Sequence, residues 1–515
     1  MGKVSAIRIR KQLKLMNNTY KLYLIIALMG LGRSGFTSLS HGQSADALIN
    51  KLVEKGILTQ KEGQDLLAET APSTNLLSAS KWKLNDAIKN ITLFGDVRFR
   101  YEHRSAQNFP AETGDPQSAY YRERFRYAVR LGLRGDLFDD FYYGLRLETS
   151  SNPRSPWVTF GDDTANKSNS NFGTPSAKNS DGINIGQVYL GWHPTSWFDI
   201  TVGKMPMPLY TTPMIWDSDI NPEGAVEKFK LPLGNAELFA NFGQFLYQDM
   251  DPDTATPSSD TFLLAWQVGL NAKLTKDISI KAAPALYSYT GVGHTNSNDQ
   301  ALGEHQVFTG QGFAGGNLNN VTVNGVAFNQ SAINDLLVFE LPAEVNFKVG
   351  KYDARVFGDF AYNLYGDDRA RAAFAAAPLT TLTIGNVTAP AGLARAYTGE
   401  DKAYQIGAAF GNLGLVYGQT SKKNTWEARA YWQHIEQYAV DVNLIDSDFF
   451  ERSNEEGVYA ALAYSITDGI LGTFRYGYAH RINKDLGTGG INPDLPVLNP
   501  INNYHILQFD LTWRF

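Results

Sequence analysis

The chain has 515 residues, more than one ordinary globular core holds, so it forms several domains or one large barrel or repeat. Apolar residues make up 43 %, which excludes a disordered protein, and the absence of cysteine excludes disulfide scaffolds and thiolate chemistry. The formal charge is −6, but residues 1–42 hold seven basic and no acidic residues, so the remainder carries −13. Such an acidic body argues against a nucleic-acid partner.

The N-terminus has the order of residues found in an export signal. Basic residues precede the apolar run at 22–31, and small and polar residues follow it. This run has 10 residues, whereas a helix that spans a bilayer needs about 18 or more. We therefore predict a signal peptide over 1–42, with a membrane anchor as the alternative.

Residues 44–70 predict a short helical hairpin. Leu48 and Leu52 fall on one apolar stripe, and Gly56 is suited to end the first helix. A polar linker over 71–90 follows. We expect the hairpin to be a periplasmic plug or spacer, and the alternative is a docking module for a partner or for the cell wall.

From residue 91 the apolar period changes from 3.6 to 2. In the first segment Val97 and Phe99 alternate with Arg98 and Arg100, which is typical of a strand with one apolar and one polar face. The same pattern returns along the chain, most weakly where glycine and alanine blur it. We predict strands at 91–104, 121–135, 141–150, 183–192, 197–203, 226–233, 236–246, 262–273, 277–289, 336–349, 352–364, 403–418, 425–437, 457–466, 469–481 and 504–515.

The connections between these 16 candidates alternate between short turns and long loops. The short ones are 135–140, 193–196, 233–235, 274–276, 350–351, 421–424 and 467–468. The long ones are 105–120, 151–182, 206–225, 248–261, 290–335, 365–402, 438–456 and 482–503. A soluble sandwich has no reason to follow this rule, whereas a membrane barrel has short periplasmic turns, long outer loops and an even number of strands. The sequence therefore predicts an all-β fold, a transmembrane antiparallel β-barrel of about 16 strands over 91–515.

The end of the chain places apolar side chains on one face of the last strand and closes on a phenylalanine. This stretch resembles the C-terminal assembly signal of bacterial outer-membrane proteins. Together with the helical hairpin, the opening strand ITLFGDVRFRYEHR and the segment VGKMPMPLYTTPMIWDSDINPEGA (202–225), it makes nearly the whole mature chain similar to the "Putative porin" family of Gram-negative bacteria. The residues of the assembly signal are Phe509, Leu511, Trp513 and Phe515.

The resemblance implies an outer-membrane channel for diffusion, with no cofactor. It also implies a homotrimer in outer-membrane lipid, inserted by the barrel assembly machinery, and small hydrophilic solutes as cargo. It names no particular solute.

Arginines recur on the polar face of the first two strands and would form one basic wall. So many like charges on neighbouring strands repel one another unless water and ions screen them, as in a water-filled lumen. The alternative is a structural ladder neutralised by Asp96, Glu102, Glu148 and loop acids. The arginines predicted to line the pore are Arg98, Arg100, Arg104, Arg122, Arg124, Arg126 and Arg130, and Arg134 follows on the same face.

The third long loop, 206–225, contains four prolines and the acids Asp217, Asp219 and Glu223. The resemblance to trimeric porins implies that this loop folds inward and narrows the pore. We therefore expect its acids to face the arginine wall across a wet gap. The alternative is an acidic loop exposed outside the membrane.

The function predicted from these features is passive diffusion of small hydrophilic solutes and ions through an outer-membrane porin. The alternatives are a solute-selective porin for an anion, phosphate or a sugar, a barrel enzyme, and an adhesin or structural barrel plugged by the loop at 290–335. An enzyme is not expected, because no convergent Ser/His/acid set is recognisable by motif, and neither a cofactor nor a metal is predicted.

Overall fold

The computed structural model describes the part of the chain that follows residue 86, with gaps. The predicted signal peptide, helical hairpin and most of the linker lie outside the described residues. The chain divides into two compact units, Met1–Asn85 and Asp86–Phe515, and the second unit holds every described residue. The described residues are 87–107, 119–150, 155–161, 168–169, 174–175, 182–248, 261–290, 336–376, 380–384, 387–391, 394–442, 444–449, 453–486, 488 and 501–515.

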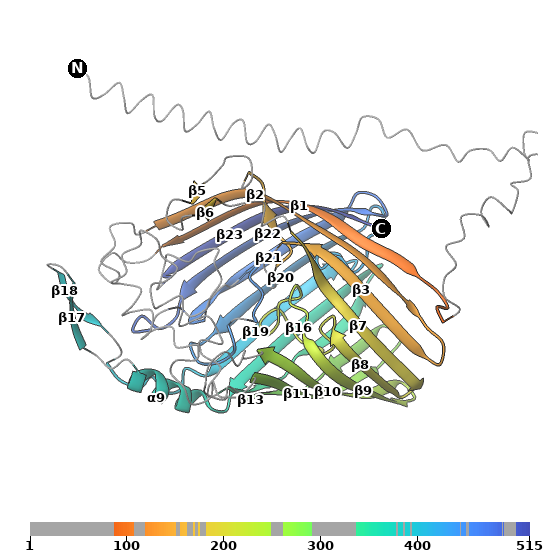
Figure 1. Ribbon diagram of the computed structural model, residues 1–515, viewed down its shortest axis with the longest axis horizontal. Helices are drawn as coiled ribbons and strands as arrows, with labels where there is room; N and C mark the ends of the chain where they lie inside the picture. Colours follow the sequence, from red (N-terminus) through yellow and green to blue (C-terminus); the bar gives the residue numbers. More distant parts are fainter. Residues whose placement is uncertain are drawn as a thin grey trace, which may run out of the picture. The chain divides into compact units, whose positions relative to one another are not determined.

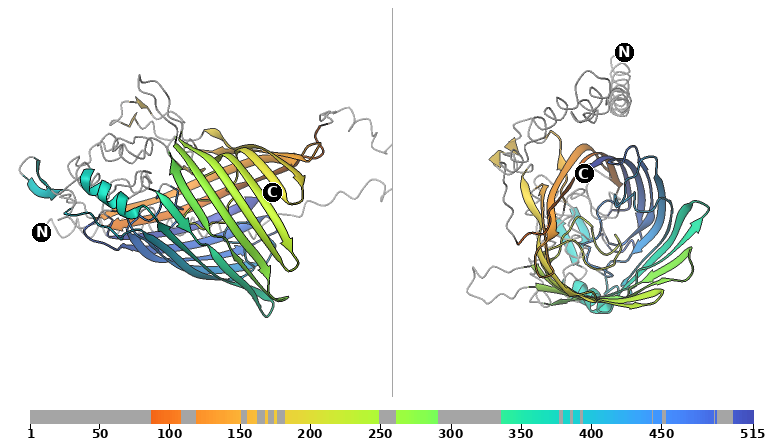
Figure 2. Two further views of the ribbon diagram at one scale, coloured as in Figure 1. Left: turned by 90° about the horizontal axis from the view of Figure 1, so that it is seen from below. Right: turned by 90° about the vertical axis from the view of Figure 1, so that its right-hand side faces the viewer.

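The second unit is a closed antiparallel β-barrel of 16 strands, which confirms the predicted architecture. Each strand pairs with its neighbours in the sequence, and the last strand, β23, pairs with the first, β1, to close the ring (Figures 1 and 2). The strands are β1 (Thr92–Gln107), β2 (Ala119–Asp136), β3 (Phe141–Thr149), β7 (Ile183–Thr195), β8 (Phe198–Lys204), β9 (Glu223–Leu233), β10 (Ala236–Gln248), β11 (Thr261–Lys273), β12 (Ile278–Ala282) with β13 (Ala285–Thr290), β14 (Leu337–Glu340) with β15 (Ala343–Val349), β16 (Tyr352–Asn363), β19 (Lys402–Gly411), β20 (Trp426–Ile435), β21 (Glu455–Ser465), β22 (Ile470–Arg481) and β23 (Asn503–Arg514).

Two of the barrel strands are interrupted at a proline. Pro284 separates β12 from β13, and Pro342 separates β14 from β15, because proline has no N–H to donate to the ladder. The halves still pair in order, β12 with β15 and β13 with β14, so each pair of segments acts as one strand.

The smaller elements lie in the long loops. A helix in the sixth long loop, α9, lies at the end of the barrel opposite the C-terminus (Figure 2). These elements are α9 (Gly366–Ala376), β4 (Val158–Thr159), β5 (Ser168–Asn169), β6 (Thr174–Pro175), β17 (Thr380–Ile384) and β18 (Val387–Ala391).

The predicted strand at 403–418 is wrong in its second half. β19 ends at Gly411, and the following turn folds into the barrel, where Leu415 and Val416 are buried. Gly411 and Gly414 have φ angles of 119° and 99°, which side-chain-bearing residues rarely adopt, and so the backbone can leave the wall here. The N–H of Val416 then donates to Oε2 of Glu427 on β20 at 3.0 Å.

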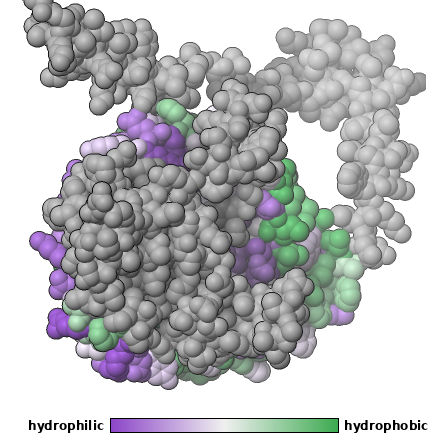
Figure 3. All heavy atoms as spheres, turned by 60° about the vertical axis from the view of Figure 1, so that its left-hand side comes forward, coloured by the Kyte–Doolittle hydropathy of each residue, from purple (hydrophilic) through white to green (hydrophobic). Residues whose placement is uncertain are grey.

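The barrel wall carries polar side chains inside and apolar side chains outside, the reverse of a soluble protein. On β1 and β2 the inward-facing Arg100 and Glu102 are 3 % and 0 % exposed, whereas the outward-facing Phe99 and Leu131 are 48 % and 44 % exposed. Apolar surface gathers on part of the outer wall in Figure 3. An apolar exterior around a charged interior is what a barrel in lipid requires, and a sandwich would bury the apolar face instead. Among the described residues, no helix is long and apolar enough to cross a membrane.

The barrel closes at a seam where the C-terminal residue meets β1. The N–H of Gly95 donates to the Phe515 carbonyl at 3.0 Å, and the Phe515 N–H donates to the Gly95 carbonyl at 3.2 Å. A Cβ at position 95 would stand 2.8 Å from Cζ of the Phe515 ring, so glycine leaves the space that this ring occupies. Leu511, Trp513 and Phe515 continue the outward face of β23.

Deleting Phe515 should reduce the yield of folded protein in the outer membrane, because it removes two backbone hydrogen bonds at the seam and leaves an open edge in lipid. Yield and the heat-modifiable mobility of the barrel on gels measure this. Phe515→Tyr is the control, since it keeps the backbone bonds and the ring. Unchanged folding of the deletion variant would remove Phe515 from the assembly signal.

Candidate functional site

The third loop, 205–222, runs inside the barrel between β8 and β9. Its apolar residues face the interior: Met205 is 1 % exposed and Met214 is 0 % exposed. On one side the loop is bound to the inner wall, where the hydroxyl of Thr211 donates to Glu340 at 2.6 Å and the hydroxyl of Tyr210 donates to Glu344 at 2.9 Å. These bonds to β14 and β15 hold the loop across the lumen.

The seventh loop, 436–454, also folds into the barrel and meets the third loop there. The N–H of Asp217 donates to the Leu444 carbonyl at 2.5 Å, and the N–H of Asp446 donates to the Pro213 carbonyl at 3.0 Å. Leu444 is 8 % exposed in the described structure. The two loops therefore narrow the lumen together.

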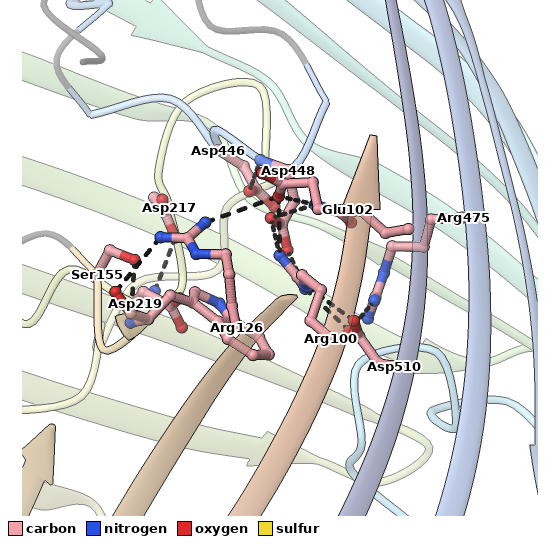
Figure 4. A network of polar contacts seen from close by, with 12 residues as sticks. Arg100, Glu102, Arg126, Ser155, Asp217, Asp219, Asp446, Asp448, Arg475 and Asp510 are labelled. Atoms are coloured by element: carbon pink, nitrogen blue, oxygen red, sulfur yellow. Dashed lines mark hydrogen bonds and ion pairs between the residues drawn. The ribbon is translucent and has the colours of Figure 1, made fainter. Parts of the chain in front are cut away.

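The predicted arginines lie on the inner face of β1 and β2, opposite these loops (Figure 4). Five of them are buried, and Arg98 and Arg122 are half-buried. The buried ones are Arg100, Arg104, Arg124, Arg126 and Arg130.

Two carboxylates of the wall neutralise much of the arginine charge. Glu102 is fully buried and lies 2.9 Å from Arg104, 2.5 Å from Arg124 and 3.6 Å from Arg126. Asp96 accepts a hydrogen bond from Nε of Arg98 at 2.5 Å. The wall is therefore a ladder of paired charges as well as a basic surface, and a buried guanidinium needs such partners.

The inward loops supply the remaining partners. Arg100 lies 2.6 Å from Asp448 of the seventh loop and 2.7 Å from Asp510 of β23, and its guanidinium stands 4.0 Å over the ring of Trp157. Arg130 lies 2.5 Å from Asp219 of the third loop. Ion pairs thus cross the lumen from the wall to both loops.

The three acids predicted for the constriction separate into two places. Asp217 and Asp219 lie inside the barrel, and the Asp219 N–H donates to Oδ1 of Asp217 at 2.8 Å. Glu223 instead belongs to β9, where its side chain is 58 % exposed and lies 2.9 Å from Lys204 of β8. The structure does not bring Glu223 to the other two.

Sequence reasoning missed Asp446 and Asp448, which the seventh loop carries into the lumen. The signal was present in the loop itself, because Val442, Leu444 and Ile445 make this segment too apolar for a loop exposed to water. The same excess of apolar residues marks the third loop.

The crowded carboxyl groups of the two loops have displaced pKa values. Burial, with repulsion from Asp446 and Asp219, raises the pKa of Asp217. Burial, with repulsion from Asp448, raises the pKa of Asp446 to about 7. Burial also disfavours charge on Asp448 and Asp219, but Arg100 and Arg130 outweigh it and lower the pKa of each. The gap therefore holds two carboxylates that stay ionised, Asp219 and Asp448, and two that titrate at higher pH, Asp217 and Asp446.

Cation selectivity should increase as the pH rises through about 7, because Asp446 gains its negative charge there. A raised pKa means that the neutral form predominates below this value and the charged form above it. Reversal potentials in a salt gradient at about pH 5 and about pH 9, two units on either side, measure the change. Asp446→Asn should show a smaller pH dependence than the unaltered chain, and an equal dependence would exclude Asp446 as its source.

The chain matches a known family over most of its length. The model of the family described as "Putative porin" matches residues 110–515. The chain belongs to this family. As a porin with a closed barrel, it is an outer-membrane channel protein of the Gram-negative type, and family and fold indicate a channel rather than an enzyme.

Solved porin structures are similar to this porin at low identity. OmpF of Salmonella typhi, in complex with daunomycin, is 9 % identical with a TM-score of 0.41, covering 84 % of this chain and 99 % of that one. OmpT of Vibrio cholerae and an anion-selective porin from Comamonas acidovorans are each 9 % identical with a TM-score of 0.38, covering 83 % of this chain and 99 % of theirs. No curated protein matches the chain.

Proposed function

We propose that this porin conducts small hydrophilic solutes and ions passively through the gap between the arginine wall and the two inward loops. The observation that carries the proposal is the pairing of charges across the lumen, Arg130 with Asp219 and Arg100 with Asp448. Opposite charges held on facing sides of the lumen create a transverse field in the water beside them, which orders the ions and polar solutes that pass.

Conductance of single channels in a planar bilayer tests this proposal. The purified chain should give stepwise ionic currents that grow with salt concentration, as a water-filled pore does. A folded barrel that inserts and carries no current would instead support a structural barrel with a blocked lumen.

The second part of the proposal concerns how the protein is exported and assembled. We infer that residues 1–42 direct export, that the helical hairpin over 44–70 stays in the periplasm, and that the barrel assembly machinery inserts the chain as a homotrimer. The C-terminal seam supports the insertion step, because the last strand must pair with β1 before the barrel has no free edge in lipid. Crosslinking of the native membrane would show the oligomer.

A further inference from the structure

A group of tyrosines on the inner wall is unexplained by the charge pairs of the constriction. Tyr431 on β20 and Tyr459 on β21 stack at 4.7 Å between ring centroids, and Phe449 of the seventh loop packs against both. Tyr417 comes from the inward-folded turn after β19 and is 41 % exposed. Four separate elements thus bring aromatic rings together on one side of the lumen.

The hydroxyl groups of these tyrosines are unused. Tyr431 and Tyr459 are 6 % and 5 % exposed, and a buried phenol usually has a hydrogen-bond partner. In the part of the chain that the structure describes, the side-chain hydroxyls of Tyr417, Tyr431 and Tyr459 form no hydrogen bond. Asp446 lies on the seventh loop three residues before Phe449, which packs against Tyr431 and Tyr459, and its charge acts on all three phenols.

The charges around the cluster are already balanced. Arg429 lies 3.1 Å from Glu427, and its guanidinium stands between the rings of Phe357 and Tyr417 at 5.0 and 4.6 Å. Arg475 is paired with Asp510 and donates to the Val416 carbonyl at 3.2 Å. The guanidinium groups are therefore engaged with protein acceptors, and the aromatic faces beside Arg429 already hold a cation.

These features select the chemistry of the ligand. An anion would be repelled by the carboxylate of Asp446, and both arginines are already paired with acids. An organic cation would be repelled by the two guanidinium groups. A neutral polyol meets neither cost, because each phenol can donate one hydrogen bond and accept others, while the carboxylate accepts. Aromatic surface with a few convergent polar groups is the usual lining of a small-molecule site. A pyranose ring offers both hydroxyl groups and apolar C–H faces.

We propose that Tyr417, Tyr431, Tyr459 and Asp446 bind one pyranose ring of a neutral sugar in transit, an inference that rests on the proposed channel function. The site lies where the seventh loop and the inward turn meet the wall of β20 and β21. A sugar held there occupies the lumen and interrupts the ionic current, so its binding is readable electrically.

Maltose added to single channels of the full chain should block the current in a saturable way. Sodium sulfate, added while the ionic strength of the bath is held constant, should not. The triple variant Tyr417→Phe, Tyr431→Phe and Tyr459→Phe keeps the rings and removes the hydroxyls. It should raise the half-blocking maltose concentration about tenfold or more, because each lost hydrogen bond weakens binding. The matched control changes the outward-facing tyrosines Tyr121, Tyr404 and Tyr476 to phenylalanine, and it should leave the block unchanged.

Calorimetric titration of the detergent-solubilised chain with maltose separates this inference from the channel function. Heat of maltose binding that is present in the unaltered chain and absent from the triple variant would support the sugar site. If no current flows in that case, only the channel proposal fails. Ionic current with neither block nor heat would overturn the sugar site and leave the channel intact. Block by sulfate instead of maltose would overturn it in favour of an anion site.

Discussion

Leu511→Arg should destabilise the barrel by up to about 2–4 kcal/mol, because it places a charge on the lipid-facing wall, where the cost rises toward the midplane of the bilayer. Leu511 is 38 % exposed on the outer face of β23, and it lies between Phe509 and Trp513 in the outward series that ends at Phe515. Unfolding in urea from lipid vesicles measures the free energy.

Thr512→Arg is the matched control, one residue further along the same strand. Thr512 faces the lumen, where its neighbour across the β1–β23 pair is Arg98. Repulsion between two such charges is worth about 1 kcal/mol at 4 Å in water, so the control should cost clearly less than the lipid-facing variant. Equal costs for the two variants would show that the faces of β23 are assigned the wrong way round.

The wall of the barrel could be predicted because it obeys a local rule. Successive side chains of a barrel strand point alternately to lipid and to water, which leaves an apolar period of 2 in the sequence. Short turns that alternate with long loops indicate an even count of strands. The rule failed at 412–418, where glycines allow the chain to leave the wall and the alternation is replaced by Leu415 and Val416 packing into the interior. Periodicity carries no information about such a departure.

The interior could be predicted only in part. The arginines were visible because they share the strand period, but their partners come from the opposite side of the lumen and from distant parts of the sequence. Asp448 lies 348 residues from Arg100, and only closure of the ring brings the seventh loop to the first strand. Glu223 shows the converse: it lies only four residues after Asp219, but it is the first residue of β9, where it pairs with Lys204 outside the lumen gap.

Ion selectivity should change in opposite directions when the two sides of the constriction are neutralised. The acidic side has the two carboxylates that stay ionised, Asp219 and Asp448, and the basic side includes Arg98 and Arg130. Removing negative charge from the gap leaves a net positive field there, and removing positive charge leaves a negative one. The Asn variants of Asp219 and Asp448 should therefore shift the reversal potential toward anions, and Gln variants of the two arginines should shift it toward cations.

The ideal potential across a tenfold salt gradient is about 59 mV, so shifts on the order of 10 mV are well within measurement. Glu223→Gln is the control on the acidic side, since this carboxylate pairs with Lys204 and lies in β9 rather than in the inward loop. It removes one negative charge from the protein without removing any charge from the gap. A shift as large as that of Asp219→Asn alone would mean that net charge, and not position, sets the selectivity.

Salt concentration provides the physical check on this interpretation. The Debye length is about 10 Å at 0.1 M and about 3 Å at 1 M, so fields that extend into a wet gap are screened at the higher concentration. The shifts should therefore shrink when both sides of the bilayer are raised toward 1 M at the same gradient. Stability should respond differently, because the pair of Arg130 with Asp219 is in direct contact at 2.5 Å and is little screened. If neither set of variants alters selectivity at low salt, the paired charges hold the loops in place but do not face the permeating ions.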